Sequence, residues 1–552
     1  MRKLFIFIII IGIAVFAYTH FHSQNDAAKL NAHYAVLSIV SGSENKGLEP
    51  IIQKWAKQQG YSIHLKYMGS VDISHCLKLG KGCEYDAIWP ANSLWITLGD
   101  TQHVVRHEKS ILRSPVVLGL KKTIAESLGW IDNPNVTITD ILNAAEAGKF
   151  RLGMTSATQS NSGTSAYIGF LYAMAKRPDI LLPEHLNDPT IQDRVRRILA
   201  TVDRGSGSSG WLKEAYVANP DKLDAIFNYE AMIIEANLGW TNKHGKKIPG
   251  LVARNQEPLY AIYPTDGIMI ADSTLGYIDK NNAAKENVFL ALQNYLLSKS
   301  IQEQIKAMGR RTGIIGLDVE AADTFVWNPQ WGIDIQRQIA TIPVPSANVI
   351  MQALNLYQTS LRKPSLTVWV LDVSGSMGGD GIQQLRNAMF NLLDPTIAAT
   401  NLLQIGAKDV TIVIPFNHGV VAVWKLTGNQ SDEILTLLQK TQTLHASGGT
   451  NMYGALLKAL EEIHVYHNKG TLWNYLPAIV AMTDGRSDSN SKSAFLHQLD
   501  KLPFGKDIPI HAIAFGNSDE SQLRQLTKLS IGRLFHSKGD LPKTLRKAKG
   551  YN

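Results

Sequence analysis

Short apolar runs alternate with amphipathic helical patterns along most of this chain. In its first part, runs rich in β-branched and aromatic residues have the length of strands, and segment 48–58 has the apolar spacing of a helix. The strands expected from this pattern are 34–39, 62–67, 85–89, 115–120 and 151–154. Segments 227–236 and 259–272 each predict a strand and helix pair. Such alternation indicates an α/β fold.

Small, hydroxyl-rich loops follow several of these strands. SGSENK covers 41–46, and a loop rich in serine and glycine precedes a helix expected to begin near Gly163. Loops at the carboxyl ends of strands line the ligand cleft of an open α/β sheet. The second loop can present backbone N–H groups to an anion, or it can be an ordinary helix cap.

Three other segments bear on domain organisation. GSGSSG at 205–210 reads as a flexible surface loop, because a linker there would split the surrounding pattern. Residues 286–309 predict one long amphipathic helix. Residues 318–364 hold two prolines in TIPVPSANV and a helical run at 349–361, so we expect this segment to be a linker with a coupling helix.

The last third of the chain contains the most informative pattern. A buried-strand run, 366–372, ends in a loop that carries Asp372, Ser374 and Ser376 at alternate positions. One carboxylate and two hydroxyls suit a hard cation such as Mg²⁺ or Ca²⁺. The alternative is a capping turn at the start of the next helix.

Two later stretches favour the cation. SGGTN at 447–451 opens an apolar-periodic helix, and the apolar strand of LPAIVAMTD ends at Asp484. Loops at the carboxyl ends of neighbouring parallel strands meet over one crevice. We therefore expect Thr450 and Asp484 to complete an oxygen cage begun by the first loop.

The three motifs DVSGSM, SGGTN and MTDGRSD together resemble the von Willebrand factor A domain with an intact metal-ion-dependent adhesion site. The resemblance covers 365–543 and implies a Rossmann-like fold that holds Mg²⁺ or Ca²⁺. It implies direct ligation by three hydroxyls, with the two carboxylates binding directly or through water. The implied ligands are Asp372, Ser374, Ser376, Thr450 and Asp484. In that family, a partner protein fills the open coordination position with an acidic side chain.

Residues 33–317 resemble the bacterial extracellular solute-binding proteins of the two-lobed type, on the order of their elements and on the loops SGSENK and SNSGTSAY. The resemblance implies two α/β lobes that close on a small solute. The residues assigned to the cleft are Ser43, Asn45, Ser114, Ser162 and Thr164. Hydroxyls and helix N-termini favour a small polar or anionic solute, and no arginine is placed to clamp a carboxylate.

Composition sets broad limits. At 552 residues, with 45% hydrophobic and 18% charged, the chain is globular and exceeds one hydrophobic core. Its formal charge of +8 is spread along the sequence without a basic, aromatic-rich stretch, so we expect no nucleic-acid partner.

The N-terminus reads as a signal peptide or membrane anchor over 1–24. Arg2 and Lys3 precede an apolar run from Leu4 to Tyr18, and we favour an uncleaved anchor with the bulk of the chain outside the cytoplasm. Cleavage would make the protein secreted. The two cysteines, Cys76 and Cys83, are expected to form a disulfide in such a compartment.

Catalytic motifs are not found in the sequence. His107 and Glu108 begin a zinc-protease pattern, but Ile111 replaces the second histidine, and no nucleophile elbow or phosphate-binding loop occurs. We therefore expect a non-enzymatic, envelope-associated binding protein that combines solute binding with metal-dependent adhesion. The alternatives are a transport component docked through its metal domain and a metal-dependent hydrolase or chelatase-like subunit.

Overall fold

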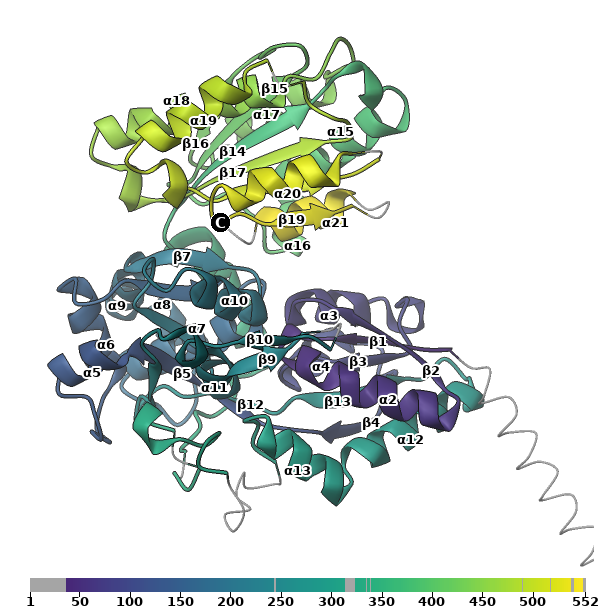
Figure 1. Cartoon of the computed structure of the whole chain (residues 1–552), viewed down its shortest axis with the longest axis vertical. Coiled ribbons are helices and arrows are strands. Elements are labelled where there is room, and N and C mark those ends of the chain that lie inside the picture. Colours follow the sequence, from purple (N-terminus) through teal and green to yellow (C-terminus); the bar gives the residue numbers. More distant parts are fainter. Residues whose placement is uncertain are drawn as a thin grey trace, which may run out of the picture.

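The computed structural model describes residues 36–242, 245–312, 323–333, 335–337, 339–488, 490–516, 518–537 and 541–549. The segment 1–24 that was expected to be a signal peptide or anchor lies outside these residues. No helix of the described part of the chain combines the length and the apolar character of a membrane span. Figure 1 shows two lobes side by side and a third sheet-containing domain above them.

The first lobe is built on a five-stranded sheet in the order β2-β1-β3-β13-β4. Its strands are β1 (Val36–Ser41), β2 (Ser62–Tyr67), β3 (Ala87–Trp89), β4 (Val105–Ser110) and β13 (Thr274–Ile278). Strand β1 runs parallel to β2 and β3, whereas β13 is antiparallel to its neighbours. The main helices are α2 (Glu49–Gln59), α3 (Ser70–Leu77), α4 (Leu94–Gly99), α12 (Ala283–Leu296) and α13 (Lys299–Ala307).

The prediction of one helix over 286–309 is wrong, because α12 and α13 are separate. Ser298 has extended backbone angles, and its Oγ donates a hydrogen bond to the carbonyl of Tyr295 at 2.7 Å. Such a bond to the local backbone competes with helix continuation.

The second lobe has a six-stranded sheet in the order β11-β5-β8-β6-β7, with β12 beside β5. Its strands are β5 (Ser114–Lys121), β6 (Leu152–Thr155), β7 (Val202–Ser206), β8 (Ala225–Tyr229), β11 (Leu259–Ile262) and β12 (Ile270–Ala271). The helices are α5 (Lys122–Ser127), α6 (Ile138–Glu146), α7 (Asn161–Met174), α8 (Pro183–Asn187), α9 (Pro189–Ala200), α10 (Ser209–Ala218) and α11 (Glu230–Leu238). The predicted pair at 227–236 is seen as β8 and α11, but 259–272 holds two strands and no helix.

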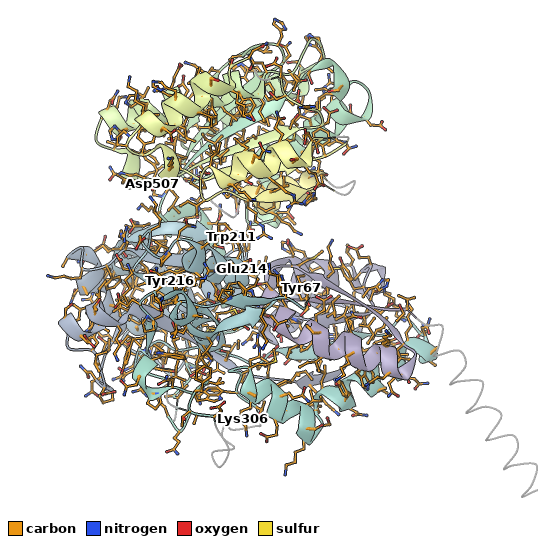
Figure 2. The ribbon with its side chains drawn as sticks, in the orientation of Figure 1. Tyr67, Trp211, Glu214, Tyr216, Lys306 and Asp507 are labelled. Atoms are coloured by element: carbon orange, nitrogen blue, oxygen red, sulfur yellow. A yellow bond between two sulfur atoms is a disulfide. The ribbon has the colours of Figure 1, made fainter. Side chains whose placement is uncertain are left out.

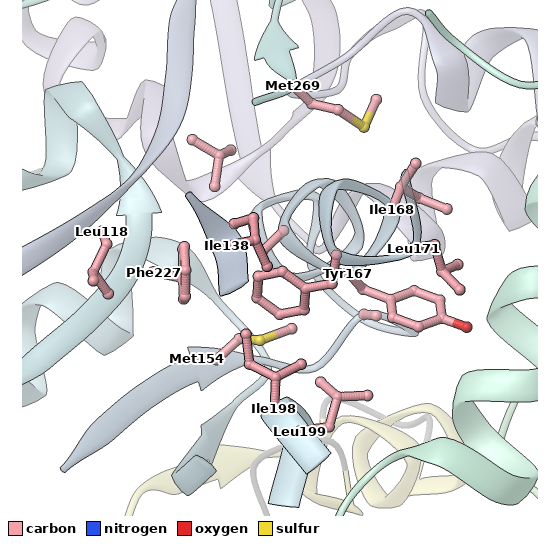
Figure 3. Close-up of a cluster of buried hydrophobic side chains, with 14 of the residues drawn as sticks. Leu118, Ile138, Met154, Tyr167, Ile168, Leu171, Ile198, Leu199, Phe227 and Met269 are labelled. Carbon is pink, nitrogen blue, oxygen red and sulfur yellow. The ribbon is translucent and has the colours of Figure 1, made fainter. Parts of the chain in front are cut away.

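The core of the second lobe packs around α7. Tyr167 is fully buried, with Phe170 in edge-to-face contact with Phe227 at 5.1 Å between ring centroids. Figure 3 shows Tyr167, Phe227 and Met154 among the clustered side chains. The phenol of Tyr167 donates to the carbonyl of Ala353 at 2.9 Å. That carbonyl belongs to α14 (Ala347–Leu356), so the coupling helix is packed into this lobe.

The C-terminal domain is a six-stranded sheet in the order β16-β15-β14-β17-β18-β19. The strands are β14 (Ser365–Asp372), β15 (Val410–Phe416), β16 (Trp424–Thr427), β17 (Leu476–Thr483), β18 (Ile510–Ala514) and β19 (Leu534–His536). All pairs are parallel except the one between β15 and β16. One face packs against α15 (Asp380–Leu393), α17 (Ser431–Gln442) and α21 (Leu541–Lys549). The other packs against α18 (Met452–Asn468), α19 (Lys492–Lys501) and α20 (Glu520–Lys528).

Direct contacts join the C-terminal domain to the second lobe. The ammonium of Lys363 donates to the carbonyl of Val202 at 3.1 Å, and Lys222 forms an ion pair with Asp507. Figure 2 shows Asp507 at the boundary between the two domains, with Trp211 also close to it. The indole of Trp211, on α10, packs against the core of the C-terminal domain.

A buried ion pair fixes the start of β14. The two terminal guanidinium nitrogens of Arg362 donate to the Asp409 carboxylate. The same carboxylate accepts from the N–H groups of Ser365 and Gly406 at 2.8 Å each. Burial alone raises the pKa of Asp409, but Arg362 and these N–H groups bring the pKa below its usual value. The carboxylate is therefore stabilised in its charged form, and its contribution to stability is lost as pH falls below the usual range of a carboxyl group.

We predict that Asp409→Asn lowers the free energy of unfolding by about 3 kcal/mol, because it leaves a buried guanidinium without its counter-charge. Urea denaturation followed by tryptophan fluorescence measures the change. Asp500→Asn is the matched control, since its ion pair with Lys506 is exposed and its loss is expected to cost less than about 0.5 kcal/mol. Equal effects of the two substitutions would contradict the role given to Asp409.

Candidate metal site and solute cleft

The carboxyl ends of β14 and β17 bring the predicted metal loops together. The two strands are adjacent and parallel, with Leu371 opposite Met482. Asp372 is the last residue of β14, and Asp484 directly follows β17. Two aspartates far apart in sequence therefore lie at the same edge of one sheet.

A continuous chain of hydrogen bonds connects four of the predicted ligands. The N–H of Ser374 donates to Asp372 Oδ1 at 2.8 Å, and the Ser374 and Ser376 hydroxyls are 3.1 Å apart. The Ser376 hydroxyl donates to Asp484 Oδ1 at 2.8 Å. The alternate spacing of Asp372, Ser374 and Ser376 thus places their polar groups on one side of the loop, facing Asp484.

The loop that carries Thr450 is joined to the other two loops by backbone hydrogen bonds. The N–H of Gly375 donates to the Gly448 carbonyl at 2.9 Å, which joins the first and second loops. The Thr450 carbonyl accepts from the N–H of Asp488 at 2.9 Å, which joins the second and third. Within the described residues, no hydrogen bond links the Thr450 hydroxyl to the other four predicted ligands.

The electrostatics of the edge suit a cation. Asp372 is fully buried, and burial raises its pKa, with the nearby charge of Asp484 adding to the effect. Hydrogen bonds from Ser374 and Thr483 act in the opposite direction. A divalent cation would favour the charged form of both carboxylates, and a donor set made only of oxygen atoms matches Mg²⁺ or Ca²⁺. The residues present therefore fit such an ion.

Two supporting residues were not singled out from the sequence. Thr483 donates from Oγ1 to Asp372 Oδ2 at 2.5 Å, so each oxygen of that carboxylate accepts a bond. The Ser487 hydroxyl accepts from the N–H of Met452 at 3.0 Å and donates to the Thr450 carbonyl at 3.2 Å. Both residues stand inside the MTDGRSD stretch, on either side of Asp484.

The first predicted cleft residue, Ser43, lies in the short 3-10 helix Ser43–Leu48 and contacts the opposite lobe. Its hydroxyl accepts from the Ser208 hydroxyl at 2.9 Å and from the N–H of Gly210 at 3.3 Å. A second bond across the lobes runs from the Trp95 indole to Asn161 Oδ1 at 2.7 Å. The two lobes therefore meet directly at the cleft.

The prediction of a flexible surface loop at 205–210 is wrong. Strand β7 ends at Ser206, and α10 begins at Ser209, with the Ser208 hydroxyl accepting from the N–H of Trp211 at the helix start. The glycines and serines form a tight strand-to-helix turn that faces Ser43.

The other predicted cleft residues are held by internal bonds. Asn45 donates to the Ser41 hydroxyl at 3.2 Å, and the Ser114 hydroxyl accepts from the N–H of Ala231 at 3.1 Å. The Ser162 hydroxyl lies 2.7 Å from that of Ser209, whereas Thr164 donates to the Ala157 carbonyl at 2.6 Å. Thr164 thus bonds the segment that leads into its own helix.

Charged groups near the crossover between the lobes were also missed. Arg311 forms a buried two-pronged ion pair with Glu230 at 2.8 Å, and Arg310 pairs at 2.5 Å with Glu235, which also bonds Lys213. The sequence signal was GRRTG together with the two glutamates of NYEAMIIEA. Both arginines lie close to the lobe boundary, yet each is matched by a glutamate of the protein itself.

Cys76 and Cys83 form a disulfide in the structure, with 5.1 Å between their Cα atoms. The bridge spans the end of α3 and the turn after it. Cys76 also lines a cavity of about 340 Å³ between the first lobe and the C-terminal domain, which includes Met68 and Leu79 on one side and Leu392 and Leu545 on the other.

Comparison with known proteins agrees with this arrangement. Residues 37–311 match the family model described as bacterial extracellular solute-binding protein, and residues 368–544 match that of the von Willebrand factor type A domain.

Individual relatives are more distant. A curated relative, inter-alpha-trypsin inhibitor heavy chain H2 of Sus scrofa, is 32% identical over 128 residues, covering 22% of this chain and 12% of its own length. The chain thus spans about an eighth of that protein.

Two solved structures are similar to this chain at a low level. The periplasmic molybdate-binding protein of Azotobacter vinelandii is 17% identical, with a TM-score of 0.33, covering 50% of this chain and 100% of its own. The ferric binding protein from Campylobacter jejuni is 16% identical, with a TM-score of 0.41, covering 58% and 98%. On the two family matches, this chain consists of a bacterial extracellular solute-binding domain followed by a von Willebrand factor type A domain.

Proposed function

We propose that this protein is an extracytoplasmic binding protein in which a solute cleft is joined to a metal-dependent adhesion site for a protein partner. The observation that carries the proposal is the hydrogen-bonded chain from Asp372 through Ser374 and Ser376 to Asp484. It gathers two carboxylates and two hydroxyls from separate loops at one exposed edge of the sheet. We further propose that residues 1–24 anchor the chain in the membrane.

In this proposal Mg²⁺ or Ca²⁺ is held by Ser374, Ser376 and Thr450, with Asp372 and Asp484 binding directly or through water. The bound ion supplies a positive charge that a carboxylate of the partner can approach. The protein orients the ligands. Thr483 fixes one oxygen of Asp372, the N–H of Ser374 fixes the other, and Ser376 holds Asp484.

The contacts between domains support joint action of the two modules. Tyr167 ties α14 to the second lobe, and Lys363 and Lys222 hold the C-terminal domain to the same lobe. The first lobe instead faces that domain across the cavity lined by Met68 and Leu392. We propose that movement of the first lobe, on opening or closing of the cleft, changes this boundary and so influences partner binding.

We predict that the double variant Ser374→Ala, Ser376→Ala loses saturable binding of Mg²⁺ and Ca²⁺, because both hydroxyl ligands are removed. Isothermal titration of the fragment from residue 33 measures the binding, first alone and then with an acidic peptide present to supply the missing ligand. Ser431→Ala, Ser493→Ala is the control, since both serines are exposed and lie on helices outside the three loop motifs. Unchanged affinity in the first variant would refute the assigned ligands.

A second prediction concerns the residue behind the site. Thr483→Val removes the bond to Asp372 without removing a ligand, and we expect the metal affinity to fall about tenfold, as for other groups that orient metal ligands. The same titration provides the measurement.

Thr411→Val is the matched control for Thr483→Val, because Thr411 is also a buried strand threonine. It lies near the start of β15, opposite Thr367 and at the far end of the strands from the metal loops. Its metal affinity should equal that of the unmodified protein. If Thr483→Val also leaves the affinity unchanged, Thr483 does not orient Asp372.

A further inference from the structure

A carboxylate oxygen without a hydrogen-bond partner lies between the two lobes. Glu44 belongs to the 3-10 helix Ser43–Leu48, and its Oε1 atom is buried and makes no hydrogen bond with any described residue. Glu44 borders a small void of about 10 Å³. The void is lined from the first lobe by Ala91 and Ser273 and from the second by Ser114, Tyr229 and Ala231, with Leu112, Ala271 and Arg310 completing it.

The neighbouring cationic side chains, Arg310 and Lys46, interact with other groups. Arg310 donates to the backbone carbonyl of Glu44 at 2.9 Å, to the carbonyl of Met308 at 3.0 Å and to the Glu235 carboxylate at 2.5 Å. The Lys46 ammonium lies over the ring of Tyr67, 5.8 Å from its centroid. No ion pair to the Glu44 carboxylate is formed within the part of the chain that the structure describes.

Two of the three hydroxyls that line the void accept a hydrogen bond, and the third donates one. Ser114 accepts from the N–H of Ala231, Ser273 donates to Asn45 Oδ1 at 3.3 Å, and the Tyr229 phenol accepts from Asn161 Nδ2 at 3.1 Å. The remaining lining is aliphatic. An oxyanion placed here would face the Glu44 carboxylate, whereas a cationic donor would give that carboxylate the partner it lacks.

The backbone makes room for this carboxylate. A Cβ atom added to Gly42 would lie 1.9 Å from Glu44 Oε1, so the position of the carboxylate depends on glycine there. Burial raises the pKa of Glu44 to about 7, although the charges of Arg310 and Lys46 act in the opposite direction. Burying a carboxylate oxygen without a hydrogen-bond partner is energetically unfavourable, and ionisable groups with such shifted pKa values are concentrated at functional sites.

We propose that the cleft binds a small solute carrying a primary ammonium group, which donates to the carboxylate of Glu44. This inference rests on the proposed function of the first module as a solute-binding domain. The void is about the size needed for one water molecule, which an ammonium head group also matches. A larger solute enters only if the bonds from Ser43 to Ser208 and from Trp95 to Asn161 open.

Isothermal titration of the protein at pH 8 tests this with methylammonium and ethanolamine as cationic probes and with molybdate and sulfate as oxyanions. We expect binding of the two amines, at least about tenfold weaker in Glu44→Gln because the buried charge partner is lost. Glu49→Gln is the matched control, since Glu49 lies five residues further along and accepts a bond from the Tyr67 phenol.

The affinity for methylammonium should also rise between pH 6 and pH 8, because Glu44 loses its proton in that window while the amine stays charged. The ionisable groups that face Glu44 are Arg310, Lys46, Tyr67 and Tyr229, and the pKa of each tyrosine is raised above its ordinary value. Both tyrosines therefore keep their protons in this window. Gly42→Ala, which displaces the Glu44 carboxylate, should also weaken methylammonium binding. It is the substitute variant if Glu44→Gln does not fold.

Binding of molybdate or sulfate in place of the amines, or amine binding unchanged in Glu44→Gln, would overturn the inference while leaving a working solute cleft. Failure of all four probes to bind would overturn it too. The adhesion site is tested separately by the metal titration, so failure of the cleft proposal is distinguishable from failure of the metal-site proposal.

Discussion

The carboxylate of Asp372 is the constraint on which the C-terminal domain depends. One of its oxygens accepts from the N–H of Ser374, and the other accepts from the hydroxyl of Thr483 on the neighbouring strand. These bonds fix the loop after β14 against the end of β17. Burying such a charge is unfavourable in the absence of compensation, and the nearby Asp484 adds repulsion. A divalent cation would relieve both effects, and the donor set of oxygen atoms matches the hard cation that we propose for this site.

The solute-binding domain follows a related principle in its cleft. Polar groups that could have contacted solvent are paired across the lobes, as Ser43 is with Ser208 and Trp95 is with Asn161. Among the described residues, Glu44 Oε1 has no hydrogen-bond partner, and we propose that a ligand supplies one. Because α14 is packed into the second lobe, we propose that the C-terminal domain stays with that lobe while the first lobe changes its boundary with both.

Much of the arrangement at the carboxyl ends of β14 and β17 could be predicted from the sequence. The strand that ends at Asp372 and the one that precedes Asp484 are continuous apolar runs, and the hydroxyls between them follow at fixed spacing. Parallel strands place their carboxyl ends together, so the convergence of these residues follows from topology alone. The role of Thr483 was not visible, because a strand threonine pointing toward a carboxylate looks the same in sequence as one pointing into a core.

The cleft was harder to predict because its contacts join distant segments. Ser43 and Ser208 are separated by 165 residues, so nothing local distinguishes the turn at 205–210 from a solvent-exposed loop. Glu44 was passed over within SGSENK for the same reason. A glutamate in a polar loop is usually solvated, and only the second lobe, brought against it in the folded protein, buries its oxygen. The break between α12 and α13 depends on Ser298, whose hydroxyl donates to the backbone carbonyl of Tyr295. Hydrophobic periodicity does not reveal such a bond.

The most direct test of the central claim is anomalous diffraction from crystals of this protein soaked in Mn²⁺, which takes the same oxygen ligands as Mg²⁺. We expect an anomalous peak within bonding distance of the hydroxyls of Ser374 and Ser376, with Asp372 and Asp484 beside it. The hydrogen bond from Ser376 to Asp484 should then be rearranged. A peak at another position, or no peak at saturating Mn²⁺ with an acidic peptide present, would contradict it.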